Sequence, residues 1–158
     1  MKIEKVAVIG AGLMGSGIAA QVANAGFPVT LLDIVPEGAT NRNIIAESAV
    51  KKMLKPVKLG SPTPLMHRKN ARLISTGNIE DNLDLVADAD LIIEVVLEKV
   101  EVKHDVFDKI DKFRKKDSII TSNTSTIPRK QLVEGMSKAF ARDFMITHFF
   151  NPPRYLRL

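Results

Sequence analysis

Cysteine and tryptophan are absent from this 158-residue sequence, and aromatic residues make up only 5% of it. The lack of cysteine excludes disulfides, thiolate metal sites and a cysteine nucleophile. It is also compatible with a reducing cytoplasm, where we expect the protein to reside. We predict no metal site.

Long apolar runs are missing as well. The longest apolar stretches have the length of a strand, far below the roughly 20 residues that cross a bilayer. The first residues, Met-Lys-Ile-Glu-Lys, pass directly into Val6-Ala7-Val8-Ile9, so no secretory signal is visible. We therefore expect a soluble protein without a membrane partner.

Neither sign of charge is confined to one region. The formal net charge is +5, but the 23 basic residues are spread among 18 acidic ones. With so few aromatics, this dispersal predicts no nucleic-acid partner, and a small acidic ligand suits the basic balance equally well. The length and the 45% hydrophobic content allow one core, so we predict a single domain over residues 1–158.

Short apolar runs alternate with helical patterns along the chain. This order predicts an α/β fold, a doubly wound Rossmann-type domain with a mostly parallel sheet. Helices are expected from Met14 to Asn24, with Met14, Ile18 and Val22 on one face, and around Val102, Val106, Ile110 and Phe113. The predicted strands are 5–9, 29–33, 71–75, 91–96, 118–122 and 144–149.

A helical excursion follows the second strand, from Glu37 to Arg68. Apolar residues recur in it at helical spacing, and basic residues crowd one end until a glycine-proline turn breaks the run. The apolar residues are Ile45, Ala49 and Met53, the basic ones are Lys51, Lys52, Lys55 and Lys58, and the turn is Gly60-Ser61-Pro62.

The most informative local motif is Gly10-x-Gly12-x-x-Gly15. Because it follows an apolar strand and opens a helix, each glycine has a role. Gly10 makes the tight turn, Gly12 allows a pyrophosphate to approach closely, and Gly15 lets the helix pack on the strand. The free N–H groups at the helix start would then face the phosphates.

Asp33 lies at the end of the second strand, 18 residues beyond Gly15. A carboxylate there can accept hydrogen bonds from ribose hydroxyls and would repel a 2'-phosphate, and neither Ile34 nor Val35 offers a cation for that phosphate. The motif and Asp33 together predict NAD as the cofactor. The alternative is a glycine turn that only packs a helix, with Asp33 as a cap.

Two segments of the second half carry a family resemblance: Ser122-Asn123-Thr124-Ser125 and Thr147-His148-Phe149-Phe150-Asn151-Pro152-Pro153. With the glycine loop, they make the chain resemble the 3-hydroxyacyl-CoA dehydrogenases, and its last residues resemble the branch fused to an enoyl-CoA hydratase. The resemblance implies NAD-dependent oxidation of L-3-hydroxyacyl-CoA to 3-ketoacyl-CoA in fatty-acid β-oxidation. It also implies an acyl-CoA substrate and a homodimeric full-length protein.

His148 and Ser125 are the candidate catalytic residues. An imidazole is well suited near neutral pH to take a proton from an alcohol while hydride leaves the same carbon. Ser125 can place its hydroxyl against the substrate oxygen, as the matching family serine does. Without the resemblance, His148 reads as a core histidine and Ser122–Ser125 as a polar turn that bonds its own backbone.

The resemblance implies further ligand contacts. Those to the cofactor are Leu13, Met14, Val96, Glu98, Lys103, Ser125 and Asn151, and those to coenzyme A are Ser48 and Lys55. Each has a plainer alternative. Glu98 and Lys103 could be surface charges at a helix start, Asn151 could belong to an Asn-Pro turn, and the lysines of the excursion could form a solvated face.

The sequence also departs from the family. The family histidine is oriented by a glutamate about a dozen residues further on, near position 160, and a helical second domain follows; neither is in this chain, which resembles a piece of a longer protein. We therefore expect it to bind NAD but to turn over poorly. Two other functions remain open: a dehydrogenase of a free hydroxy acid, which typically uses a lysine base, and a non-catalytic NAD-binding protein.

Overall fold

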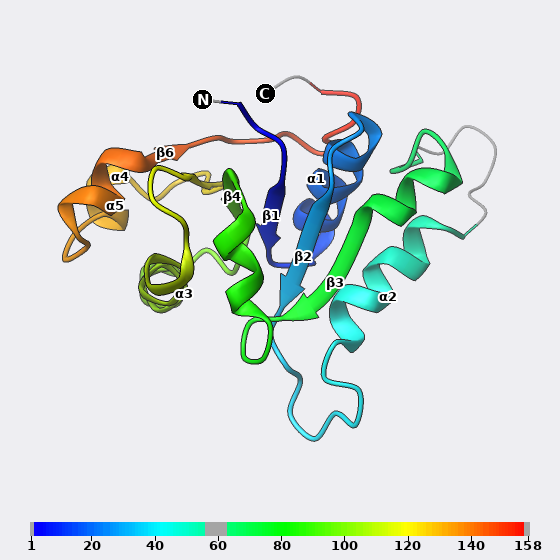
Figure 1. Ribbon diagram of the computed structural model, residues 1–158, viewed down its shortest axis with the longest axis horizontal. Coiled ribbons are helices and arrows are strands. Elements are labelled where there is room, and N and C mark those ends of the chain that lie inside the picture. The colour runs from blue at the N-terminus through cyan, green and yellow to red at the C-terminus, as the bar shows by residue number, and fades with distance from the viewer. Residues whose placement is uncertain (1, 56–62, 157–158) are drawn as a thin grey trace.

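The computed structural model describes residues 2–55 and 63–156. The strands are β1 (Val6–Ile9), β2 (Val29–Asp33), β3 (Ile74–Asn78), β4 (Leu91–Glu94), β5 (Ile119–Ser122) and β6 (Phe144–Ile146). The helices are α1 (Leu13–Asn24), α2 (Ile44–Met53), α3 (Val100–Phe113), α4 (Arg129–Leu132) and α5 (Lys138–Asp143), with 3-10 helices η1 (Arg68–Leu73) and η2 (Leu83–Asp88). Figure 1 shows their arrangement.

The six strands form one sheet in the order β3-β2-β1-β4-β5-β6, and every neighbouring pair is parallel. The chain starts at the centre with β1, builds outward to β3, and then crosses back to β4 on the other side of β1. This is the doubly wound order predicted from the sequence. Since all strands run in one direction, their carboxyl ends meet at one edge, where ligands bind beside the switch between β1 and β4.

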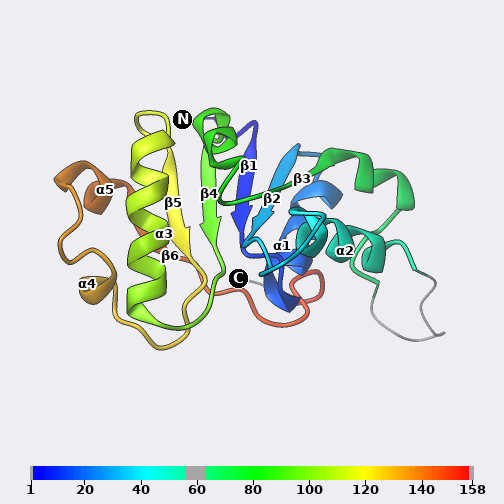
Figure 2. The same cartoon turned by 90° about the horizontal axis from the view of Figure 1, so that it is seen from below.

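Helices cover both faces of the sheet (Figures 1 and 2). On one face α1 and α2 bury Ile18 and Met53 against β1, β2 and β4. On the other, α3 and η2 pack with β4 and β5. Phe107, Phe140 and Phe144 contact each other there, with ring centroids 5.3–5.5 Å apart. Burial on both faces explains why the strands read as continuous apolar runs.

The buried face of α1 includes the predicted Ile18 but is shifted toward smaller residues. Met14 and Val22 are only half-buried, whereas Gly15, Ala19 and Ala23 are buried with Ile18. Small side chains let the helix axis come close to the sheet, so Met14 and Val22 lie at the edges of the contact. Large apolar residues alone therefore predicted the centre of the buried face about one residue away from its observed position.

One strand was predicted three residues too early. Residues 71–73 belong to η1, whose start is capped by His67, which accepts a hydrogen bond from the Lys69 N–H. The strand β3 instead extends through Gly77 to Asn78. An added Cβ at Gly77 would lie 2.8 Å from Asn82 Oδ1 and 2.9 Å from Leu32 Cδ2, so a larger residue there would require these side chains to move.

Two other strands end earlier than predicted, β4 at Glu94 and β6 at Ile146. Beyond each end, the backbone pairs with a side chain. The Val96 N–H donates to Glu94 Oε1 at 2.7 Å, and the Phe149 N–H donates to Asn123 Oδ1 at 2.8 Å. Both hydrogen bonds lie at the carboxyl edge of the sheet, where the chain leaves each strand and enters a loop.

The predicted helical excursion contains α2. Ala49 and Met53 are buried and Ile45 packs against the same core cluster, as the spacing predicted, while Lys51, Lys52 and Lys55 are exposed. Lys58 and the Gly60-Ser61-Pro62 turn lie outside the described residues.

Candidate functional site

The glycine loop joins β1 to α1 at the centre of the carboxyl edge. Gly10 has φ 108°, and an added Cβ would lie 2.5 Å from the Val95 carbonyl oxygen. A Cβ on Gly15 would lie 1.8 Å from the Gly10 carbonyl oxygen, so this helix turn is in contact with the loop itself. A Cβ on Gly12 would meet nothing within 4 Å. The loop is therefore close-packed on its inner side and open at Gly12, as a pyrophosphate requires.

Asp33 ties the end of β2 to this loop. Its Oδ2 accepts a hydrogen bond from the Ala11 N–H at 2.5 Å, and its Oδ1 accepts one from the Ile34 N–H at 2.6 Å. The carboxylate opens into a cavity of about 360 Å³, the Asp33 hollow, which Gly12, Ile79 and Val96 also line. It can accept further hydrogen bonds from ligand hydroxyls there.

The charges around the Asp33 hollow disfavour a phosphate on the 2'-hydroxyl of a bound ribose. Glu80 and Asp105 add carboxylates to the lining, where Glu80 pairs with Arg42 at 2.8 Å and Asp105 pairs with the lining cation Lys109 at 2.7 Å. A ribose with free hydroxyls suits this acidic surface better than a ribose 2'-phosphate. The geometry thus supports the preference for NAD over NADP.

A second cavity, of about 460 Å³, lies on the other side of Gly12 and is called the His148 hollow. Its size falls within the usual range for small-molecule sites. Nine predicted site residues line it: Gly12, Leu13, Met14, Val96, Glu98, Lys103, Ser125, His148 and Asn151. The sheet thereby gathers residues from four separate stretches of the chain at the mouth of the glycine loop.

The His148 ring is held in one tautomer. Its Nδ1 lies 3.2 Å from the Thr124 carbonyl oxygen. A carbonyl can only accept a hydrogen bond, so Nδ1 carries the proton and Nε2 keeps its lone pair. The ring also meets Phe150 edge-on, with centroids 5.1 Å apart and planes at 90°. The free nitrogen is thus available to accept a proton.

Asn123 supports this arrangement in a way that the sequence did not reveal. Instead of bonding its own turn, its side chain accepts the hydrogen bond from Phe149, the residue after His148. This contact joins the loop after β5 to the segment after β6. Ser125 follows β5 and His148 follows β6, and these two strands pair up to Ser122. The distance between Ser125 and His148 therefore depends on the positions of both strands.

The surface-charge alternative for Lys103 is wrong. Its side chain is 1% exposed, and its Nζ lies 2.7 Å from Glu94 Oε1 and 3.3 Å from Glu98 Oε2. Glu94 is fully buried at the end of β4 and also accepts a hydrogen bond from Ser122 Oγ at 2.5 Å. Sequence reasoning missed Glu94, although a carboxylate at the end of a strand buried on both faces needs a partner.

Glu98 holds the loop that carries Ser125. Its Oε1 accepts hydrogen bonds from Thr124 Oγ1 at 2.6 Å, from the Ser125 N–H at 2.9 Å and from the Thr126 N–H at 3.2 Å. Burial by itself raises the pKa of Glu98, but these hydrogen bonds and the charge of Lys103 outweigh it and lower the pKa from 4.5 to about 2. Glu98 therefore carries a negative charge across the working pH range.

The low pKa of Glu98 predicts how its contribution to stability changes with pH. A carboxyl group whose pKa is depressed by folding stabilises the protein fully above its unfolded pKa, near 4.5, and loses that contribution as the pH falls toward about 2. The gap in unfolding free energy between the wild type and Glu98→Gln should be constant from pH 7 to pH 5 and should shrink below that. Urea unfolding at a series of pH values measures it, and a gap that persists unchanged at pH 3 would contradict the assignment.

The predicted coenzyme A residues are only partly brought to a site. Ser48 lines a third cavity, the Ser48 hollow, between the start of α1 and α2. Lys52 lines it too, one helical turn further along α2. Lys55 is exposed beyond the end of α2 and is not among the residues that line this hollow. Lys52 lies four residues after Ser48, so helix geometry places both residues on one face of α2. This spacing could have identified Lys52 from the sequence.

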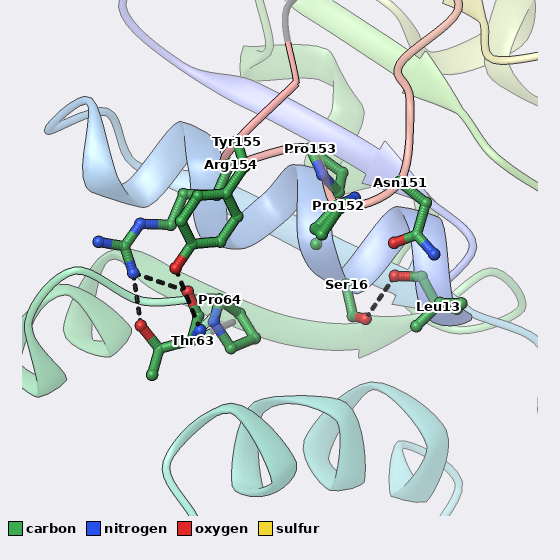
Figure 3. A pocket seen from close by; sticks show the side chains of 10 residues that line it. Leu13, Ser16, Thr63, Pro64, Asn151, Pro152, Pro153, Arg154 and Tyr155 are labelled. Atoms are coloured by element: carbon green, nitrogen blue, oxygen red, sulfur yellow. Dashed lines mark hydrogen bonds between the residues drawn. The ribbon is translucent and has the colours of Figure 1, made fainter. Parts of the chain in front are cut away.

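A fourth cavity lies between α1 and the segment Asn151–Tyr155, as Figure 3 shows. Arg154 closes one end by donating to the Thr63 carbonyl oxygen at 2.7 Å, and Tyr155 Oη accepts from the Thr63 N–H at 3.3 Å. Leu13 lines this cavity, the His148 hollow and the Ser48 hollow. The three cavities therefore adjoin one another around the exposed start of α1.

Within residues 2–55 and 63–156, no helix has the length and apolarity that a bilayer crossing requires. Within the same ranges, no group of three or more histidine, aspartate or glutamate side chains is placed to hold a metal ion.

The doubly wound sheet and the cavities along its carboxyl edge define the dinucleotide-binding domain of a dehydrogenase. Residues 5–158 match the family model described as 3-hydroxyacyl-CoA dehydrogenase, NAD binding domain. The chain therefore belongs to that family, and NAD is its cofactor.

Relatives and solved structures agree with this family. A Deinococcus radiodurans protein named as a probable 3-hydroxyacyl-CoA dehydrogenase is 50% identical over 158 residues, which cover 100% of this chain and 44% of that protein. A Bacillus subtilis protein of the same name is 46% identical and is covered to 21%. The solved (S)-3-hydroxybutyryl-CoA dehydrogenase of Ralstonia eutropha has a TM-score of 0.71 and 30% identity, covering 96% of this chain and 50% of that one. The chain thus spans less than half the length of the curated relatives described here.

Proposed function

We propose that this chain is the cofactor-binding part of an L-3-hydroxyacyl-CoA dehydrogenase, which oxidises the C3 hydroxyl of the substrate to a ketone. The observation that carries the proposal is that His148 and Ser125 open into the same hollow as the glycine loop. A proton acceptor, a hydroxyl and a cofactor cradle are what alcohol oxidation by hydride transfer requires. The activity of the longer relatives and the expected homodimer belong to this proposal.

The chain's residues fit NAD. The open space at Gly12 leaves room for the pyrophosphate at the start of α1, and Asp33 would accept hydrogen bonds from the adenosine ribose. The nicotinamide half would then reach the His148 hollow, beside Met14, Val96 and Glu98. When bound, NAD supplies the hydride acceptor.

The protein residues handle the proton and the oxygen. The free Nε2 of His148 accepts the hydroxyl proton, and the Thr124 carbonyl keeps the ring oriented as it becomes positively charged, since Nδ1 donates in both forms. The Ser125 hydroxyl donates to the substrate oxygen. Its contact with Glu98 Oε1 is long, at 3.4 Å, so the hydroxyl can turn to a ligand.

The position of Lys103 argues against the free hydroxy acid alternative. A lysine base must present its amine to the substrate. Lys103, the lysine that lines the His148 hollow, is instead 1% exposed, and its Nζ is engaged in ion pairs with Glu94 and Glu98. His148 is thus the better base.

Coenzyme A would run from the His148 hollow past Leu13 toward the Ser48 hollow. The shared lining of the adjoining cavities gives it a continuous path along α1. Lys52 and Ser48 can pair with phosphate at the far end, because a lysine ammonium and a hydroxyl are suitable phosphate partners.

His148→Gln tests the proposed reaction. With NADH bound, we expect the wild-type chain to reduce acetoacetyl-CoA slowly in single-turnover assays. His148→Gln should slow this step at least about 100-fold, the usual effect of removing a general acid or base, with less than about a twofold change in NADH affinity. His67→Gln, an exposed histidine outside all four cavities, is the matched control. An unchanged rate in His148→Gln, or no reduction by the wild type with both ligands bound, would refute the proposal.

A further inference from the structure

Glu94, Lys103 and Glu98 form a cluster with one more negative than positive charge. The ammonium of Lys103 lies between the two carboxylates but is closer to Glu94, at 2.7 Å against 3.3 Å from Glu98. Glu94 is completely buried and receives two further hydrogen bonds, from Ser122 and the Val96 N–H. Lys103 thus mainly offsets Glu94, and the uncompensated charge lies on Glu98.

This excess charge faces the cavity. The Glu98 side chain is 37% exposed, whereas Lys103 is 1% exposed and Glu94 is fully covered. The charged residues in the lining of the His148 hollow are Glu98 and Lys103, beside the neutral ring of His148. The hydrogen bonds to Glu98 Oε1 from Thr124, Ser125 and Thr126 fix the carboxylate in place without adding a positive charge.

The two forms of the cofactor differ by one charge in the ring that would occupy this hollow. The oxidised nicotinamide is a cation and the reduced ring is neutral, while their ribose, amide and phosphate groups are the same. A fixed negative charge at the wall of the hollow therefore acts on one form only. Buried and partly buried charges of this kind act through a lower dielectric than bulk water.

We propose that the excess negative charge of the Glu94–Lys103–Glu98 cluster, presented by Glu98, shifts cofactor binding toward the oxidised form relative to the reduced form. Glu98 is thus a specificity-determining residue for the redox state of the cofactor. Glu94 is a positioning residue, because it takes up the charge of Lys103 that would otherwise cancel Glu98. This inference rests on the proposed function, since it assumes that the nicotinamide lies in the His148 hollow.

The experiment compares the dissociation constants of NAD⁺ and NADH for the wild type and Glu98→Gln. NADH binding is read from the fluorescence of its reduced nicotinamide, and NAD⁺ is measured by its displacement of NADH. A contact that both forms lose changes both dissociation constants by the same factor, so it leaves their ratio unchanged. Glu98→Gln should weaken NAD⁺ roughly three- to tenfold relative to NADH, as expected for a partly exposed charge a few ångströms away.

Three comparisons separate charge from structure. Glu98→Asp keeps the charge and should keep a ratio close to that of the wild type. Glu101→Gln removes one carboxylate from the exposed side of α3 and should leave the ratio unchanged. The effect of Glu98→Gln should also decrease at high salt, because ions screen a partly exposed charge.

The outcomes distinguish this inference from the function on which it rests. If both cofactor forms bind and Glu98→Gln leaves their ratio unchanged, the charge effect is refuted while the proposed function stands. If the ratio changes equally in Glu101→Gln, the effect is not specific to the cluster and the inference fails. If the wild type binds neither form, the proposed function fails, and this inference fails with it.

Discussion

Gly15→Ala is expected to destabilise the domain by at least about 3 kcal/mol, at or beyond the upper end of ordinary overpacking. The new Cβ would lie 1.8 Å from the Gly10 carbonyl oxygen, and backbone atoms cannot move aside as a flexible side chain can. Either α1 must move away from the sheet or the loop must change shape. NADH affinity should therefore fall at least tenfold in the protein that remains folded. Urea unfolding and NADH titration measure the two effects.

Gly12→Ala is the matched control for this prediction. Its Cβ would enter open space, and the backbone there, with φ −64°, is allowed for alanine. The unfolding free energy should change by less than about 1 kcal/mol, the scale of an N-cap substitution, while NADH binding should weaken at least tenfold because the methyl group occupies the space for the pyrophosphate. Equal losses of stability in the two variants would contradict this account of the loop.

Lys103→Met is expected to cost about 3–5 kcal/mol of unfolding free energy, because it leaves the fully buried Glu94 without its counter-charge. Lys109→Met gives a comparison on the same helix. Lys109 pairs with Asp105 at 2.7 Å, but both side chains are largely exposed, so that substitution should cost less than about 1 kcal/mol. Urea unfolding of both variants and the wild type measures the difference.

The double variant Glu94→Gln with Lys103→Met separates the two explanations for such a loss. Removing both charges leaves no unpaired buried ion, so at least half of the lost stability should return. A double variant as unstable as Lys103→Met would show that the packing of the lysine stem, rather than the buried charge, carries the stability.

The doubly wound class of the sheet and the glycine loop were accessible from the sequence, because the alternation of apolar runs with helical patterns and the glycine spacing are local patterns. Apolar runs of strand length predicted all six strands, with errors at their ends. At the end of β4, hydrophobicity does not show where a backbone N–H exchanges a strand partner for a side chain, as Val96 does with Glu94. At the start of β3, it does not distinguish the strand from the 3-10 helix η1 that precedes it.

Intrinsic preference and tertiary contact give opposite predictions at Gly15. Alanine is the better helix former by about 1 kcal/mol, so the helix alone favours Gly15→Ala. The folded chain forbids it because the loop packs against that turn. The same close approach of helix and sheet places Gly15, Ala19 and Ala23 beside Ile18 on the buried face of α1.

The sequence by itself determined the doubly wound fold and the cofactor loop with Asp33, because their spacing to neighbouring strands and turns carries this information. His148 and Ser125 became candidates through the family resemblance, since the residues alone fit a core histidine and a polar turn equally well. Only the tertiary structure decided the tautomer of His148, the burial of Lys103 and the role of Glu94. Each of these depends on which atoms from distant strands come within a few ångströms. Charge and proton positions are set by those partners, which the linear sequence does not specify.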